Sequence, residues 1–447
     1  MIIRLLPWLI VGAVAGLSIR AHADDAAQRS RRTPVVAVFE KCRDAVVNIN
    51  TRKTVRVRSL RLPSIFDEIF ETRPRTRTRR VTSIGSGIVV HESGYIVTNA
   101  HVVSQAIDVR VTFADDRTLS AEIVAVDSEH DLAVLKVSSR QALTYLKLGR
   151  SDDIMIGETV IAIGNPLGLR HTVTAGIVSA LERELSFSQN VSYRGLIQTD
   201  ASINPGNSGG PLLNVNAELI GINTAIRGDA QNIGFAIPVD RLWSLLPVML
   251  DVERHKRVAF GLEVSGPEAK VIRIRPDSPA AETDLRPGDR LVAFNGEPLR
   301  DGIDYYVHLL GQESGNDVRL TARRGAETVS AIIPLVAVPL PDGRELAAAL
   351  LGVRLAKVPA RLRREFELPR GVGLVVEGVD RRGPADRAGI EKGDILLRLD
   401  RVSVPSFEDV GLLLERVKPG SHIIVEGFRL HDDPPFRWEA AIRTRRP

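Results

Sequence analysis

Short runs of apolar and β-branched residues, separated by turn residues, succeed one another through the middle of the chain. They occupy 85–90, 94–99, 109–113, 121–126, 131–137, 158–163, 172–181, 196–198, 218–224 and 233–237. Many short strands with turn signals between them indicate an all-β barrel or sandwich. An aromatic content of only 4% also favours a β-rich architecture over a helical bundle. Helices are expected at the margins, near 34–39 and at 239–250.

A serine at the centre of a glycine-rich turn is the first candidate for chemistry. Ser208 lies between two of the apolar runs, within Gly206-Asn207-Ser208-Gly209-Gly210-Pro211. Glycine permits backbone angles that residues with a Cβ resist, so this turn can expose the hydroxyl and aim N–H groups at a developing oxyanion. Similar sequences also form ordinary turns, and a nucleophilic serine needs a base. The turn alone therefore does not establish catalysis.

Two earlier residues are suited to assist this serine. His101 follows one apolar run as the candidate base, and Asp131 opens another as the candidate orienting acid. The order His, Asp, Ser is the order of chymotrypsin-type enzymes, in which histidine accepts the serine proton and aspartate orients the histidine. A lone histidine or aspartate at a strand end is usually structural. The three together in one β-rich region predict a catalytic triad.

The C-terminal part of the chain contains an internal repeat with a period of about a hundred residues, which indicates two copies of a small domain. In each copy a Pro-Ala pair precedes a Gly-Asp pair, and the spacing from Pro279 to Gly288 equals that from Pro384 to Gly393, nine positions. A strand and a turn follow each Gly-Asp pair. A proline-rich linker at 334–343 separates the copies.

The first 23 residues have the pattern of a secretory signal peptide. Arg4 supplies the positive start, residues 5–19 are apolar, and Ala21-His22-Ala23 fits a small-x-small cleavage site. An uncleaved membrane anchor is the alternative, but an apolar run of about 15 residues is short for a membrane span. We therefore expect cleavage after Ala23 and export.

The net charge of +5 arises largely from residues 52–80, which carry ten basic and three acidic side chains. We expect a solvated loop here; a regulatory or partner-binding loop is the alternative, and neither nucleic-acid binding nor membrane contact is predicted. The single cysteine, Cys42, cannot form an internal disulfide and is expected to be a small apolar residue. No Cys/His spacing indicates a metal, and no glycine-lysine phosphate motif indicates ATP, so we expect no cofactor.

Residues 83–245 resemble the protease domain of the HtrA/Deg family of serine proteases, and 255–447 resemble the two PDZ domains that bacterial members carry. The protease resemblance rests on Gly85-Ser86-Gly87, Thr98-Asn99-Ala100-His101-Val102-Val103, Asp131-Leu132-Ala133-Val134-Leu135, Ile163-Gly164-Asn165-Pro166, Gln198-Thr199-Asp200-Ala201, Asn204-Pro205-Gly206-Asn207-Ser208-Gly209-Gly210-Pro211 and Gly234-Phe235-Ala236-Ile237-Pro238.

The resemblance implies a mostly β protein, with a chymotrypsin-like double β-barrel protease domain of two six-stranded barrels followed by two α+β PDZ domains. The expected parts are a signal peptide at 1–23, an N-terminal segment with the basic loop at 24–82, the protease domain at 83–250, and PDZ domains at 255–338 and 348–445.

For the protease site, the resemblance implies the triad His101, Asp131 and Ser208. It also implies an oxyanion hole from the N–H groups of Gly206 and Ser208, with Asn207 between them. Further expected site residues are Ile203, which lines a small apolar S1 pocket, Ile233 at the end of its other wall, and Arg183, in the loop before Leu196, which relays activation from the PDZ domain. Arg227 and Asp229 depart from the glycine-rich versions of the wall at 225–233.

For the PDZ copies, the resemblance implies capture of C-terminal carboxylates by loop N–H groups, with the peptide added to a sheet edge. The matching loops are Phe260-Gly261-Leu262 and Leu351-Gly352-Val353. The first copy is the better candidate, because Gly261 lies 18 positions before Pro279, whereas the interval from Gly352 to Pro384 in the second copy is 32. The longer interval also holds the basic run Arg361-Leu362-Arg363-Arg364.

These features together predict an exported, periplasmic, ATP-independent serine endopeptidase that degrades unfolded or damaged proteins. Its expected partners are unfolded substrates and C-terminal peptides. The resemblance further implies a homotrimer of this chain, with larger assemblies left open. The alternative is a chaperone or scaffold that holds clients through its PDZ domains and cleaves little.

Overall fold

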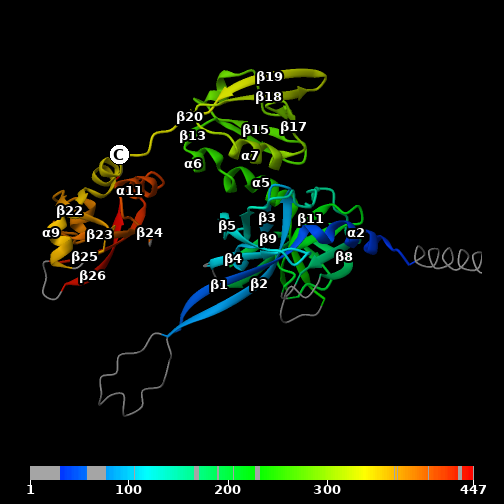
Figure 1. Cartoon of the computed structure of the whole chain (residues 1–447), viewed down its shortest axis with the longest axis horizontal. Coiled ribbons are helices and arrows are strands. Elements are labelled where there is room, and N and C mark those ends of the chain that lie inside the picture. The colour runs from blue at the N-terminus through cyan, green and yellow to red at the C-terminus, as the bar shows by residue number, and fades with distance from the viewer. Residues whose placement is uncertain are drawn as a thin grey trace, which may run out of the picture. The chain divides into compact units, whose positions relative to one another are not determined.

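The computed structural model describes residues 31–57, 77–104, 106–165, 171–188, 191–204, 206–226, 232–366, 368–369, 371–400, 402–430 and 435–445 (Figure 1). The predicted signal peptide and the centre of the basic loop lie outside these residues. The chain divides into two compact units at Val336 and Ala337. Within the described ranges, no helix has the length and apolar character needed to cross a membrane.

The first unit begins with a closed six-stranded barrel. Helix α2 (Pro34–Cys42) and a 3-10 turn (Arg43–Ala45) precede it, and the short helix α4 (Ala100–Val103) interrupts it. Cys42 is buried, and burial raises the pKa of its thiol to about 11 against the effect of Lys41. The barrel order β1-β2-β3-β6-β5-β4 is formed by β1 (Val46–Val57), β2 (Arg77–His91), β3 (Tyr95–Thr98), β4 (Ala106–Thr112), β5 (Thr118–Asp127) and β6 (Leu132–Val137).

A second closed barrel of six strands follows in the same unit. Its order β10-β11-β12-β9-β8-β7 is formed by β7 (Thr159–Gly164), β8 (Thr172–Ser188), β9 (Val191–Thr199), β10 (Pro211–Asn214), β11 (Leu219–Ile226) and β12 (Gly234–Pro238). Helix α5 (Val239–Met249) comes next, close to the expected 239–250. The double β-barrel implied by the family resemblance is confirmed.

Two local expectations are wrong. The segment expected to be a loop from residue 52 is partly strand, because β1 and β2 continue their antiparallel register to the pair Val57 and Arg77. Figure 1 shows this pair of strands extending beyond the barrel. Arg183 was expected in a loop but lies within β8, paired with Leu196 of β9. In the first segment strand pairing overrides the charge composition, and in the second β8 continues beyond residue 181, where the expected strand ended.

The rest of the first unit is a small α+β domain. It contains α6 (Val252–Lys256), β13 (Val258–Ala259), β14 (Leu262–Ser265), β15 (Lys270–Ile274), a 3-10 turn (Pro279–Glu282), β16 (Arg290–Phe294), β17 (Glu297–Pro298), α7 (Gly302–Leu310), β18 (Asp317–Arg324) and β19 (Glu327–Pro334), and β20 (Val336–Ala337) spans the boundary. The main sheet has the order β14-β15-β16-β18-β19, so β14 is an edge strand.

The second unit repeats this design. Its elements are α8 (Gly343–Leu346), a π-helical turn (Ala347–Leu351), β21 (Val353–Lys357), α9 (Ala360–Glu365), β22 (Leu374–Val379), α10 (Pro384–Arg387), β23 (Ile395–Leu399), β24 (Val402–Ser403), α11 (Phe407–Leu414), β25 (His422–Arg429) and β26 (Phe436–Arg443). The order β21-β22-β23-β25-β26 matches the first copy strand for strand. The repeat read from the sequence is therefore a repeat of fold.

The aspartate of each Gly-Asp pair has the same structural role in both copies. Asp289 accepts two bonds from Arg324, both 2.8 Å, and these bonds hold the pKa of its carboxyl below the usual range despite burial. Asp394, which is fully buried, accepts two 2.8 Å bonds from Arg429. In each copy the aspartate precedes a central strand, β16 or β23, and the arginine ends the neighbouring strand, β18 or β25. The ion pair therefore ties these two strands together at the middle of the sheet.

Asp394→Asn is expected to lower the free energy of unfolding of the second copy by about 3–5 kcal/mol, because it leaves the Arg429 charge without its buried partner. The matched control is Glu391→Gln. Glu391 binds the same arginine at 3.0 Å, but its side chain is 56% exposed, so the loss should stay below about 1 kcal/mol. Urea-dependent hydrogen exchange at β23 and β25 of the full chain measures both. Equal losses in the two variants would contradict this account.

Candidate active site

His101 and Asp131 lie in direct contact at the rim of the first barrel. Asp131 precedes β6 with a φ of 55°, and its side chain is buried. Its two carboxylate oxygens lie 2.9 and 2.8 Å from His101 Nδ1, and Oδ1 also accepts from the His101 N–H at 3.0 Å. Because a carboxylate only accepts, Nδ1 carries a proton and Nε2 is the acceptor nitrogen of a neutral ring. The aspartate thus fixes both the orientation and the tautomer of His101.

Thr224 of β11 links the aspartate to the candidate nucleophile, a role that the sequence pattern did not indicate. Its hydroxyl donates to Asp131 Oδ2 at 2.6 Å, and its carbonyl accepts from Ser208 Oγ at 3.1 Å. Thr224 is buried within a strand. One residue of the second barrel therefore contacts both an acid of the first barrel and the serine of the turn.

Ser86 of β2 holds the serine turn from the other side. Its Oγ donates to the Gly206 carbonyl at 2.6 Å, and its N–H donates to the Ser208 carbonyl at 2.8 Å. The same Oγ accepts from Asn165 N–H at 2.9 Å, and the Ser86 carbonyl accepts from Thr98 at 2.7 Å. Ser86 is fully buried. It lies in one of the glycine-flanked sequences that resemble the protease family, but the sequence indicated no role for its hydroxyl.

Close packing explains two of the glycines around the turn. A Cβ on Gly164 would lie 2.1 Å from Asn207 Oδ1, and a Cβ on Gly209 would lie 2.2 Å from the Ser86 carbonyl. Gly209 also has a φ of 83°, which residues with a Cβ rarely adopt. Any larger side chain at either position would displace the turn.

The turn brings the expected oxyanion residues together. Gly206 has a φ of 105°, and the Asn207 N–H donates to the Asn204 carbonyl at 2.9 Å. Among the described residues, the N–H groups of Gly206 and Ser208 have no assigned acceptor. The arrangement can offer these two donors to an oxyanion, while the Asn207 N–H serves the turn itself.

The other expected protease residues are placed as follows. Ile203 is buried in the interior of the second barrel beside Gly234, and Ile233 is half-buried. Arg183 is exposed and donates to Gln198 at 3.0 Å. Residues 227–231, including Arg227 and Asp229, lie outside the described residues. Among those described, no group of three or more His, Cys, Asp or Glu side chains could hold a metal ion.

Both expected carboxylate loops have a glycine in the left-handed region, with φ 89° at Gly261 and 73° at Gly352. Their flanking residues are buried: Phe260, Leu262, Leu351 and Val353. The glycine N–H groups are occupied differently. Gly261 donates to Glu253 Oε1 of α6 at 2.7 Å, and Gly352 donates to the Ala348 carbonyl at 3.1 Å.

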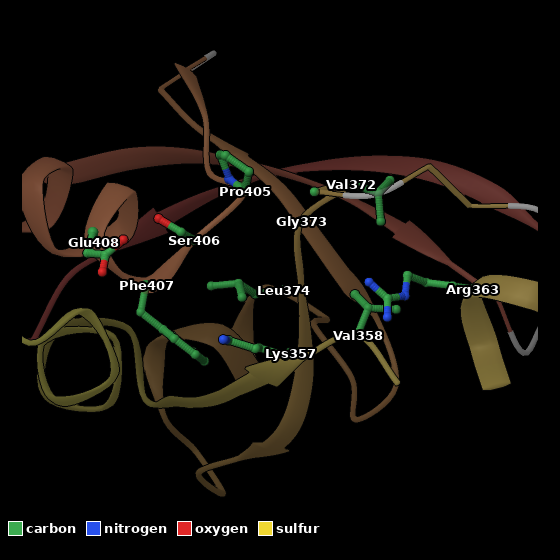
Figure 2. Close-up of a pocket in the computed structure, with 11 residues that line it drawn as sticks. Lys357, Val358, Arg363, Val372, Gly373, Leu374, Pro405, Ser406, Phe407 and Glu408 are labelled. Carbon is green, nitrogen blue, oxygen red and sulfur yellow. The ribbon is translucent and has the colours of Figure 1, made fainter. Parts of the chain in front are cut away.

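The second copy contains a cavity of about 290 Å³. It opens between the end of β21, the start of β22 and the start of α11, and Figure 2 shows Lys357, Leu374 and Phe407 around it, with Arg363 at one side. The cavity therefore lies at one end of the strand and helix between which a PDZ domain receives a peptide.

Comparison with known proteins agrees with this architecture. A trypsin-like peptidase domain matches residues 85–222, and a PDZ domain matches 270–324 and again 375–426. The chain is 34% identical to a probable periplasmic serine endoprotease DegP-like of Halomonas elongata, over 92% of this chain and 94% of that protein. It is 32% identical to the periplasmic pH-dependent serine endoprotease DegQ of Escherichia coli, over 91% and 92%. The solved HtrA-type protease AlgW with tripeptide is 32% identical, with a TM-score of 0.40, over 69% of this chain and 99% of that one.

The relatives match over nearly their whole length, and the two barrels and two PDZ domains of this chain account for that length. The chain belongs to the DegP/DegQ-like family of serine endoproteases.

Proposed function

We propose that Ser208 is the nucleophile of this endoprotease, with His101 as its base and Asp131 as the residue that orients the base. The observation that carries this proposal is the contact of both Asp131 oxygens with His101 Nδ1, which leaves Nε2 to accept the serine proton. A serine hydroxyl has one proton, and here it is donated to the Thr224 carbonyl. Attack on a peptide carbonyl therefore begins when the hydroxyl rotates away from the Thr224 carbonyl and donates its proton to His101 Nε2.

The N–H groups of Gly206 and Ser208 then stabilise the oxyanion of the tetrahedral intermediate. Such donors act because they are already in place when charge develops, so they need no reorganisation at that moment. The hydrogen bonds of Ser86 to the Gly206 and Ser208 carbonyls support this pre-organisation, because they hold the turn in place. His101 next gives its proton to the leaving amine, and water hydrolyses the acyl-enzyme by the same route.

The substrates we propose are unfolded or damaged proteins outside the cytoplasm. The relatives named periplasmic endoproteases support a periplasmic location, and the signal pattern supports cleavage after Ala23. Unfolded chains expose apolar side chains and free backbone. These features suit a small apolar S1 pocket lined by Ile203 and the strand edges of the PDZ domains. We propose a homotrimer as the working assembly.

A chaperone that holds clients through its PDZ domains is the competing function. The contact of His101 with Asp131 favours proteolysis, since a pure holdase has no need of it. The two activities are separable in one protein, because holding requires no nucleophile.

Ser208→Ala is expected to reduce cleavage of unfolded casein by at least about a thousandfold, because the nucleophile is lost. Fluorophosphonate labelling should disappear with it. The same variant is then tested for suppression of aggregation of a denatured client. Casein cleavage at the wild-type rate would refute the assignment of Ser208, whereas retained suppression without cleavage would show a separate holding activity.

Thr224→Val is expected to slow fluorophosphonate labelling about tenfold to a hundredfold. The substitution keeps the shape of the side chain but removes a hydrogen bond to a buried carboxylate, worth about 1.5–3 kcal/mol. The matched control is Thr174→Val, because Thr174 is a half-buried threonine of the same barrel that donates to the Ser202 carbonyl at 2.9 Å. An equal effect of both substitutions would assign the loss to general destabilisation.

A further inference from the structure

In the first PDZ domain, side chains bind backbone groups on the outer edge of β14, the strand to which a peptide would add. β14 is an edge strand whose inner side pairs with β15. In an extended strand, alternate residues direct their backbone groups to the same side. Leu262 and Val264 are two positions apart, and their carbonyls point away from β15 toward α7, as does the Val264 N–H. A peptide added to this edge would pair with these groups.

Two tyrosines of α7 occupy these backbone groups. Tyr306 Oη accepts from the Val264 N–H at 3.1 Å and donates to the Val264 carbonyl at 2.9 Å. Tyr305 Oη donates to the Leu262 carbonyl at 2.9 Å. Both rings are buried and pack edge to face, with centroids 4.9 Å apart. Burial raises the pKa of both phenols above the usual range, so both keep the protons they donate.

The carboxylate of Glu253 occupies the loop at the start of β14. Glu253 Oε1 accepts from the Gly261 N–H at 2.7 Å, and its other oxygen pairs with Arg275. The Glu253 side chain is only 20% exposed. The backbone donor expected to hold the C-terminal carboxylate of a peptide thus already holds an internal one.

The second copy shows that the fold does not require this arrangement. The N-cap of α7 is Asp301 and that of α11 is Ser406, so Tyr305 and Tyr306 correspond to Val410 and Gly411. Neither residue has a hydroxyl, and among the described residues no side-chain hydrogen bond joins α11 to β21. A Cβ on Gly411 would instead meet the Pro341 carbonyl at 2.4 Å. The tyrosine and glutamate contacts are therefore particular to the first copy.

We propose that the first PDZ domain holds its peptide groove closed, with Tyr305, Tyr306 and Glu253 in the places that the backbone and the terminal carboxylate of a bound peptide would take. A peptide enters only when α7 leaves β14 and Glu253 leaves Gly261. This inference rests on the proposed recognition of C-terminal peptides. It opposes the expectation that the first copy is the readier binder. That expectation rested on the longer, basic interval of the second copy, which gives no information about side chains that fill the groove.

The closed state is tested by hydrogen exchange in the full chain with Ser208→Ala, which prevents digestion. Tyr306→Phe keeps the ring but removes the partner of the Val264 N–H, so exchange in 260–266 should become at least about fivefold faster. Tyr95→Phe is the control, because it removes a phenol from the first barrel and should leave 260–266 unchanged. Unchanged exchange in Tyr306→Phe would overturn the proposal.

Peptide entry is measured in the same background with a fluorescent decapeptide that ends in three aliphatic residues and a free carboxylate. Glu253→Ala with Tyr306→Ala should bind it at least about tenfold more tightly than the parent, and the peptide should then protect 260–266. The C-terminal amide of the same peptide should lose this gain.

Equal affinity in parent and double variant, with protection of 260–266 in both, would show an open groove and overturn the proposal. Absence of protection in a folded double variant would also overturn it. If the double variant does not fold, hydrogen exchange in 260–266 of Tyr306→Phe still tests the proposal. Neither readout needs proteolysis, so failure here is distinct from failure of Ser208 as the nucleophile in the casein assay.

Discussion

The geometry of the active site depends on the hydrogen bonds that the buried Ser86 makes to the serine turn. Ser86 belongs to the first barrel, and through its Oγ and N–H it binds the carbonyls of Gly206 and Ser208 in the second. Asn165 and Thr98 occupy its remaining acceptors. A buried hydrogen bond is costly to break, because the group left behind stays desolvated without a partner. The serine turn is therefore positioned by the packing of two barrels, and its glycines allow the close approach that this requires.

A barrel or sandwich and the candidates His101, Asp131 and Ser208 were predicted from local signals, whereas the double barrel followed only from the family resemblance. Strand-length apolar runs, a serine between glycines, and a histidine and aspartate at run ends each require only neighbouring residues. Thr224 and Ser86 could not be found in this way, because a hydroxyl inside a strand has the same sequence pattern whether it contacts solvent or Asp131. The extension of β1 and β2 into the basic segment was missed for a related reason: charge composition predicts whether a segment is solvated, not whether its backbone pairs with another strand.

The two PDZ copies show that one strand order allows different solutions for the same exposed edge. A strand edge with free N–H and C=O groups tends to recruit another chain, so proteins cover it. In the first copy, phenol hydroxyls of α7 bind the Leu262 carbonyl and both backbone groups of Val264 at this edge. In the second copy, the position of Tyr306 is Gly411, and the segment leading into the domain packs against this glycine. The fold sets where the groove lies, and a few side chains decide what fills it.

Helix α7 joins the closed groove to the protease barrel within the first unit. Its Tyr305 and Tyr306 hold β14, and the residue before them, Asp304, is buried and lies 3.1 Å from His91 Nε2 of β2. Burial alone would raise the pKa of Asp304, but its bonds with His91 and Arg300 hold it well below the usual range. A charged, buried carboxylate resists separation from its partners. His91 lies on the same strand as Ser86, which holds the serine turn. A peptide that displaces α7 would therefore have to break the contact of Asp304 with His91 or move His91 with the helix. The closed groove and the catalytic turn are thus both attached to β2.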